Sequence, residues 1–187
     1  LDYENSKKEI QNRLILSPSK HSKLLYFKDL WSNSIDLEEI QKLENTYWNE
    51  FIKKAIINKE VLKILNDNKD EEAKYFLFTN QNTYVQLNKI TSWNLNFFDL
   101  VITSEEVGYE KPHHNFFSYV NRFVKSNYEK GHKIYAVGDD YKNDIEFWLK
   151  NYNAQSYLID NSNDEFIKNG EIFNTNILNA INHIFEK

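Results

Sequence analysis

Two carboxylates follow a short apolar run in the second half of the chain, and their spacing suits a metal site. Residues 134–137 are typical of a buried strand and lead into Gly138, after which come Asp139 and Asp144. A loop and the first turn of a helix can aim both carboxylates at one point. In α/β folds, ligands bind at the carboxyl ends of the strands, and carboxylate oxygens are ligands that Mg²⁺ prefers. The stretch therefore predicts a Mg²⁺ site with Asp139 and Asp144 as ligands.

Two earlier loops carry groups that suit a phosphate. Thr79 and Asn80 follow the apolar run 75–78, and Lys111 directly precedes Pro112. A hydroxyl and neighbouring backbone amides can donate hydrogen bonds to phosphate oxygens, and a lysine supplies a positive point charge. Because parallel strands end at the same edge of a sheet, we expect these groups to converge with the two carboxylates. Such positioning and charge neutralisation do most of the work in phosphoryl transfer.

The apolar pattern predicts the elements that must position these groups. The N-terminal part reads as helices over 2–14 and 21–32, then a helix starting at Asp36 and another from about Lys59. After residue 72, short apolar runs at 75–78, 100–102, 134–137 and 155–159 alternate with helical stretches at 82–92, 113–127, 142–151 and 174–186. This alternation indicates a parallel sheet with helical crossovers. We therefore expect an α/β fold with a doubly wound parallel sheet (56–187) and a small all-helical lobe (1–55).

The composition narrows the class of protein. With 187 residues, 41% of them hydrophobic and 27% charged, the chain is typical of soluble globular proteins. Its net charge of −5 argues against nucleic acid as a partner. No apolar run approaches the ~20 residues of a membrane helix, so no membrane partner is expected. The absence of cysteine excludes disulfides and thiolate chemistry, and the mostly polar N-terminal residues make the cytosol (cytoplasmic localisation) the expected compartment.

The order Thr-Asn, then Lys-Pro, then Gly-Asp-Asp-x-x-Asn-Asp resembles the haloacid dehalogenase-like (HAD) hydrolase superfamily. Phe76–Asn80 is similar to the family's second motif, Lys111–Pro112 to its third, and Gly138–Asp144 to its fourth. The leading helices, with His21–Leu25 and Tyr47–Phe51, resemble the helical cap of the phosphatase branch. The resemblance covers most of the chain, and three motifs in the correct order are fairly specific.

The resemblance implies a Rossmann-like core and a Mg²⁺-dependent phosphatase, a phosphoric monoester hydrolase acting on a small phosphorylated metabolite through an aspartyl-phosphate intermediate. Thr79 and Asn80 would bind the substrate phosphate, and Lys111 would hold both the phosphate and the nucleophile. Asp139 would bind Mg²⁺ directly, and Asp144 would act on it through water or another ligand. The helical lobe would close over the site and select the substrate.

One motif of the family is missing from the sequence. The nucleophile is the first aspartate of an Asp-x-Asp-x-Thr motif on the first strand, and the nearest string, Tyr26–Ser32, has Trp31 in place of the second carboxylate. That string also lies on a helical stripe. Leu1–Glu4 resembles the continuation after the motif, so we expect the first catalytic strand and its nucleophile to lie upstream of Leu1. The alternative is a chain that naturally lacks the motif.

Other interpretations remain open at this point. The main alternative is a non-catalytic HAD-like module that binds phosphate, metal or another protein. A nucleotide-binding protein is less favoured, because no glycine-rich phosphate loop is present. Asp139 and Asp144 are also favourable in a turn and at a helix start without any metal. His113 and His114 are adjacent, cannot share one helix face, and are not expected to bind metal. The sequence indicates neither the substrate nor the oligomeric state.

Overall fold

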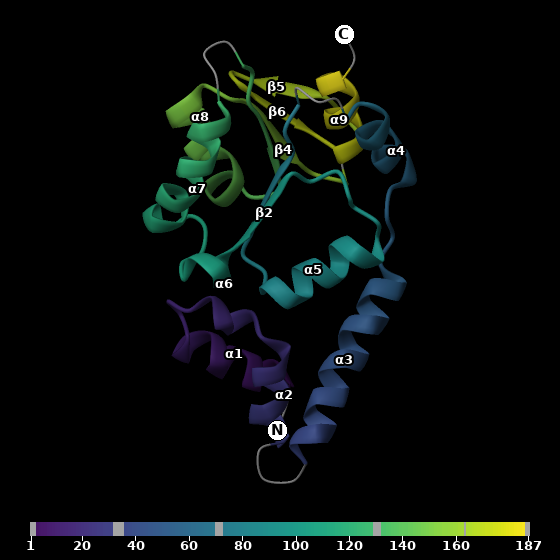
Figure 1. Ribbon diagram of the computed structural model, residues 1–187, viewed down its shortest axis with the longest axis vertical. Helices are drawn as coiled ribbons and strands as arrows, with labels where there is room; N and C mark the ends of the chain where they lie inside the picture. The colour runs from purple at the N-terminus through teal and green to yellow at the C-terminus, as the bar shows by residue number, and fades with distance from the viewer. Residues whose placement is uncertain (1–2, 32–35, 70–72, 129–131, 163, 186–187) are drawn as a thin grey trace. The chain divides into compact units, whose positions relative to one another are not determined.

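The computed structural model describes residues 3–31, 36–69, 73–128, 132–162 and 164–185 (Figure 1). It confirms the predicted α/β fold. The chain divides into two compact units, which are described one at a time. The first unit comprises residues 1–57, 77–96 and 101–110, and the second comprises 58–76, 97–100 and 111–187. The boundary expected between a helical lobe (1–55) and an α/β core (56–187) stays a prediction.

The first unit is built mainly from helices. These are α1 (Tyr3–Arg13), the short 3₁₀ helix η1 (Pro18–His21), α2 (Lys23–Trp31), α3 (Leu37–Lys54), α5 (Thr83–Ser92) and α6 (Ser104–Val107). Asp36 starts α3, because its extended backbone turns the side chain to accept a hydrogen bond from the amide of Glu38. The described residues do not include Leu1. They also exclude residues 2 and 32, which are end positions of two predicted helices.

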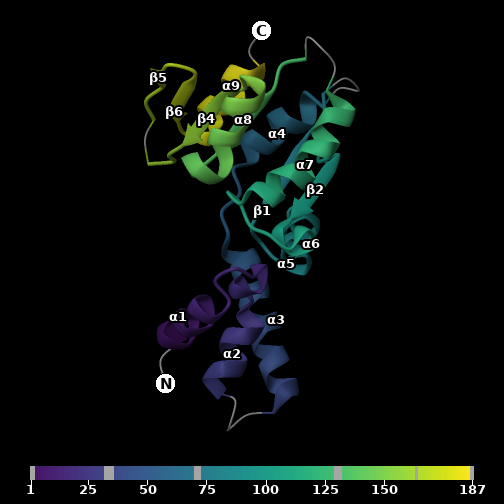
Figure 2. The same ribbon diagram turned by 90° about the vertical axis from the view of Figure 1, so that its left-hand side faces the viewer.

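Aromatic side chains supply much of the first unit's core. Helix α2 packs between α1 and α3 (Figures 1 and 2). It buries Tyr26 and Phe27 at this junction, and α3 buries Trp48. The Phe27 ring lies 5.8 Å from that of Trp31 and 6.1 Å from that of Tyr47. Since each aromatic side chain buries a large apolar area, these contacts hold the three helices together.

The second unit contains a four-stranded sheet covered by helices. Its elements are α4 (Lys59–Asp67), α7 (His114–Asn127), β3 (Tyr135–Gly138), the π-helix η2 (Tyr141–Ile145), α8 (Glu146–Tyr152), β4 (Gln155–Ile159), β5 (Ile167–Asn169), β6 (Ile172–Thr175) and α9 (Ile177–Phe185). The strand order is β3-β4-β6-β5. Strands β3, β4 and β6 run parallel, and β5 is antiparallel to β6. In Figure 1, α7 and α8 lie on one side of these strands and α4 and α9 on the other.

Strands β1 (Phe76–Thr79) and β2 (Leu100–Thr103) form a separate two-stranded sheet. In the described part of the chain, neither of them is hydrogen-bonded to a strand of the larger sheet. All four predicted strands are present, each shifted by one residue at most. None of the helices within the described ranges is long and apolar enough to cross a membrane.

The C-terminal region differs from the prediction in detail. The helix expected over 174–186 begins only at Ile177, because a hairpin of β5 and β6 precedes it. Gly170, with a φ of +64°, makes the turn of this hairpin, a conformation that favours glycine. In β6, Phe173 and Thr175 are buried in alternation with partly exposed residues. Phe173 packs with Tyr157 and Ala180 to form the core beneath α9.

Candidate active site

Two of the predicted site residues, both in the second unit, are in direct contact. The Lys111 ammonium lies 2.5 Å from Oδ1 of Asp144, and the two side chains are only 11% and 13% exposed. A pair held this far from water is stronger and better oriented than an exposed one, and it fixes the ammonium at one position. Of the groups that the sequence predicted to converge, Lys111 and Asp144 are in contact within this unit, and their roles in a site stay predictions.

The loop after β3 is shaped around Asp144. The Asp140 side chain accepts a hydrogen bond from the amide of Asn143 at 2.9 Å, which starts the π-helical turn η2. Oδ2 of Asp144 accepts a bond from the amide of Asp140 at 3.1 Å. A π-helical turn is rare and frequently occurs at functional sites. Here it directs Asp144 back toward the end of β3.

Gly138 allows this close approach. A Cβ atom at Gly138 would overlap the Cβ of Asp144 and lie 2.6 Å from both its Cγ and its Oδ2. The glycine is therefore needed for space and not for an unusual backbone angle. The sequence placed Gly138 at the end of the strand, but only the structure shows which side chain occupies the space beside it.

The environment of Asp139 is the opposite of that of Asp144, which is largely buried and paired. Asp139 follows the last residue of β3 and is exposed, and no described residue forms a hydrogen bond or ion pair with its carboxylate. An exposed carboxylate at the carboxyl end of a parallel strand suits a hard cation. Both oxygens of Asp144 are already engaged, by Lys111 and by the Asp140 amide. Of the two predicted metal ligands, Asp139 is therefore the better candidate for direct coordination.

The described residues do not contain a complete set of metal ligands. No group of three or more His, Cys, Asp or Glu side chains within the described ranges could hold a metal ion. A cation at Asp139 would therefore need oxygen ligands from substrate, water, backbone or other parts of the protein, as Mg²⁺ commonly has. The donor chemistry of Asp139 fits Mg²⁺, and the site itself stays a prediction.

Thr79 and Asn80 lie at the end of β1, in the first unit. The Thr79 hydroxyl accepts a hydrogen bond from the amide of Gln81 at 3.1 Å, which leaves its proton available to a ligand. Both residues are partly exposed, as phosphate-binding groups at a strand end need to be. Their convergence with Lys111 and Asp139, which belong to the other unit, stays a prediction.

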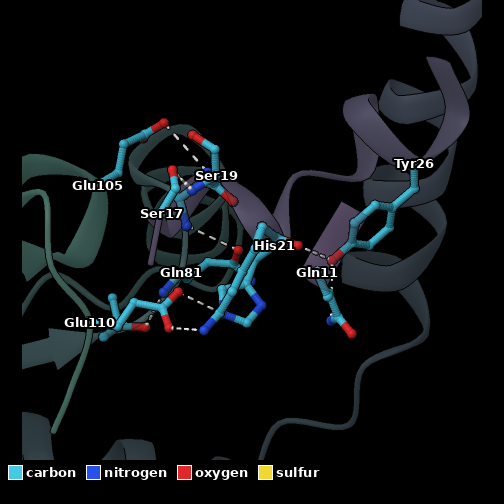
Figure 3. A network of polar contacts seen from close by, with 11 residues as sticks. Gln11, Ser17, Ser19, His21, Tyr26, Gln81, Glu105 and Glu110 are labelled. Carbon is cyan, nitrogen blue, oxygen red and sulfur yellow. Dashed lines mark hydrogen bonds and ion pairs between the residues drawn. The ribbon is translucent and has the colours of Figure 1, made fainter. Parts of the chain in front are cut away.

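A polar network in the first unit involves residues that sequence reasoning did not assign to a site (Figure 3). Glu110, the residue before Lys111, lies 2.5 Å from the Lys20 ammonium and 2.9 Å from Nε2 of His21. Burial lowers the pKa of His21 below its ordinary value, and the Glu110 carboxylate opposes this shift. The network ties η1 to the residue that leads into Lys111.

A carboxylate also caps the helix that follows Thr79. Glu105 accepts a hydrogen bond from the amide of Thr83 at 2.8 Å, at the start of α5. This hydrogen bond is the largest cause of the lowered pKa of Glu105. Nothing in the local sequence indicates this contact, because 22 positions separate the two residues.

Comparison with protein families shows a match over most of the chain. A family model described as "Haloacid dehalogenase-like hydrolase" matches residues 2–155. A relative named ribulose-1,5-bisphosphate 5-phosphatase, from Halopiger xanaduensis, is 26% identical over 147 residues, which is 76% of this chain. The chain spans 60% of the length of that relative.

Solved structures share the fold. A HAD phosphatase from Thermococcus onnurineus matches with a TM-score of 0.63 and 23% identity, over 97% of this chain and 78% of the other. A 2-haloacid dehalogenase from Pseudomonas syringae pv. Tomato DC3000 matches with a TM-score of 0.64 and 16% identity, over 97% and 77%. The putative HAD-hydrolase YfnB from Bacillus subtilis, in a structure bound to magnesium, matches with a TM-score of 0.62 and 15% identity, over 99% and 81%.

Proposed function

Because this chain belongs to the haloacid dehalogenase-like hydrolases, we propose that it is a Mg²⁺-dependent phosphatase acting on a small phosphorylated metabolite. The observation that carries the proposal is the contact between Lys111 and Asp144, together with the exposed Asp139 that directly follows β3 in the same unit. It puts a fixed positive charge and an available carboxylate on neighbouring loops of one unit. The phosphatase name of the Halopiger xanaduensis relative and the magnesium in the YfnB structure support the same activity.

Each residue has a role in the proposed reaction. Lys111 neutralises a phosphate oxygen, and Asp144 keeps the ammonium in place. Thr79 and Asn80 donate hydrogen bonds to the phosphate. Asp139 would hold Mg²⁺, whose chemistry when bound is to screen the charge of the transferred group.

The nucleophile in this proposal is an aspartate upstream of Leu1. Its carboxylate attacks phosphorus while the bond to the ester oxygen breaks; the second aspartate of the same motif gives that oxygen a proton, and an aspartyl-phosphate forms. Water then cleaves the acyl phosphate, which releases phosphate and restores the carboxylate. Residues 1–187 would bind and orient the phosphate during both steps.

The test is hydrolysis of p-nitrophenyl phosphate by the protein expressed from its complete coding sequence. We expect activity that needs Mg²⁺ and is lost with a chelator. Asp139→Asn and Lys111→Gln should each reduce kcat by about 100-fold or more, because each removes a charge that acts on the transferred group. Asp67→Asn and Lys125→Gln make the same charge changes at exposed positions and should leave the rate unchanged.

Two results would contradict the proposal. Full turnover by Asp139→Asn would show that the metal is held elsewhere. An inactive wild-type protein that still binds inorganic phosphate through Lys111 would favour the non-catalytic module instead.

A further inference from the structure

Asp140 lies in the sequence between the two carboxylates that the proposed reaction uses, and it contacts Asp144 through its backbone. Its amide donates a hydrogen bond to Oδ2 of Asp144 at 3.1 Å, and its carbonyl accepts one from the Asp144 amide at 2.8 Å. Its side chain is exposed, and Oδ1 accepts a hydrogen bond from the amide of Asn143 at 2.9 Å. The backbone and the side chain of one residue therefore fix the turn that holds Asp144.

The turn η2 depends on this side chain more than a long helix would. It spans only Tyr141–Ile145 and is π-helical, so few hydrogen bonds of its own hold it. An acceptor at the start of a helix satisfies an amide that otherwise has no partner within the helix. Without the Asp140 carboxylate we expect η2 to shift or unwind, and Asp144 to move with it.

Asp144 in turn holds Lys111. Its Oδ1 lies 2.5 Å from the ammonium, both side chains are largely buried, and the Asp144 side chain lies directly against Gly138. A charge-assisted hydrogen bond of this kind is short and directional, so a small displacement of the carboxylate weakens it. The position of the Lys111 charge therefore depends on an exposed side chain that the ammonium does not contact.

We propose that Asp140 is a positioning residue, which fixes the Lys111 ammonium through η2 and Asp144. Asp140 acts as a hydrogen-bond acceptor and not as a charge or a metal ligand, since the Asn143 amide engages its Oδ1. The inference rests on the proposed function for its effect on the reaction rate. The positioning itself can be measured without any reaction.

A coupling measurement tests the positioning in the absence of substrate. The double-mutant cycle of Lys111→Gln and Asp144→Asn is measured by urea unfolding in two backgrounds, wild type and Asp140→Ala. The Asp140→Ala background should lose most of the coupling free energy, because the two charges no longer meet in a fixed geometry. A general loss of stability would lower all four proteins of the cycle alike and leave the coupling unchanged.

Activity measurements separate the hydrogen bond from the charge. In the protein expressed from its complete coding sequence, Asp140→Ala should lower kcat for p-nitrophenyl phosphate about tenfold, the change in population that the loss of one helix cap allows. Asp140→Ser and Asp140→Asn keep an acceptor at the start of the turn and should retain most of the wild-type kcat. The Mg²⁺ concentration for half-maximal activity should stay the same in these three variants, whereas Asp139→Asn should raise it.

Asp160 provides the matched control. It is exposed, follows β4 at the same edge of the sheet, and accepts a hydrogen bond from the amide of Ser162 at 3.0 Å. Asp160→Ala therefore removes the same kind of acceptor and the same charge from a different loop of the unit. It should keep both the wild-type kcat and the coupling between Lys111 and Asp144.

The outcomes distinguish this inference from the proposed function. Unchanged coupling in the Asp140→Ala background, or a normal kcat of Asp140→Ala, would overturn the inference. A kcat of Asp140→Asn as low as that of Asp140→Ala, or a raised Mg²⁺ requirement of Asp140→Asn, would also overturn it, because Asp140 would then act as a charge or a ligand. A wild-type protein that releases no phosphate, with the coupling still lost in Asp140→Ala, would support the positioning and overturn the phosphatase instead.

Discussion

Lys111 and Asp144 are 33 positions apart in the sequence, yet Nζ of the lysine lies 2.5 Å from Oδ1 of the aspartate. Both side chains are largely buried, and the same aspartate accepts a hydrogen bond from the Asp140 backbone. This contact joins the loop before α7 to the loop after β3. It holds a positive charge against the π-helical turn η2, which follows the loop that carries the exposed Asp139.

The first prediction concerns the strength of that pair. A double-mutant cycle with Lys111→Gln and Asp144→Asn should give a coupling free energy of about 2 kcal/mol in urea unfolding, because both charges are shielded from water. Lys150 and Glu146 also lie 2.5 Å apart, but their side chains are 67% and 34% exposed. Their cycle should give a clearly smaller coupling, since water weakens an exposed pair. Equal coupling free energies in the two cycles would show that burial does not strengthen the interaction between Lys111 and Asp144.

The second prediction concerns the space beside Asp144. Gly138→Ala should destabilise the fold by about 2 kcal/mol and reduce phosphatase activity sharply, because the new methyl group displaces the Asp144 side chain. Gly170→Ala is the matched change, since nothing lies near its added Cβ and only its positive φ is strained. It should lower stability by about 1 kcal/mol and keep full activity. Chemical unfolding and initial rates measure both effects, and normal activity in Gly138→Ala would contradict the steric argument.

The third prediction follows from the lowered pKa of Glu105. A carboxylate whose pKa is lower in the folded than in the unfolded state stabilises the protein at every pH above its unfolded-state pKa. This stabilisation is lost as the pH falls through its folded-state pKa. Glu105→Gln should therefore lower the free energy of unfolding by about 0.5 kcal/mol at pH 7. The effect is modest because the residue is exposed.

The difference in stability between wild type and Glu105→Gln should shrink as the pH falls below 4.5, the ordinary pKa of a glutamate side chain. Thermal unfolding at a series of pH values measures it. Glu9→Gln, an exposed change on α1, should show no such trend. A difference that stays constant down to pH 3 would mean that the charge of Glu105 does not stabilise α5.

The sequence determined the elements and the order of the motifs. Each amphipathic helix and each strand that it predicted is present, because periods of 3.6 and 2 residues report which side of an element is buried. It also located the polar loop after β3, where glycine and aspartate interrupt the apolar pattern. The strands β5 and β6 were missed, because a short hairpin resembles a turn followed by the start of a helix until Phe173 is seen packed against Tyr157.

Only the tertiary structure decided which charges meet. In the sequence, Lys23 and Lys89 are two lysines among many, and Asp139 and Asp144 are two similar carboxylates. Packing places Lys23 and Lys89 against aromatic rings, pairs Asp144 with Lys111, and leaves Asp139 exposed. The physical reason is that burial and Coulomb energy depend on distances through space, and residues far apart in the chain set those distances only once the helices and strands have packed.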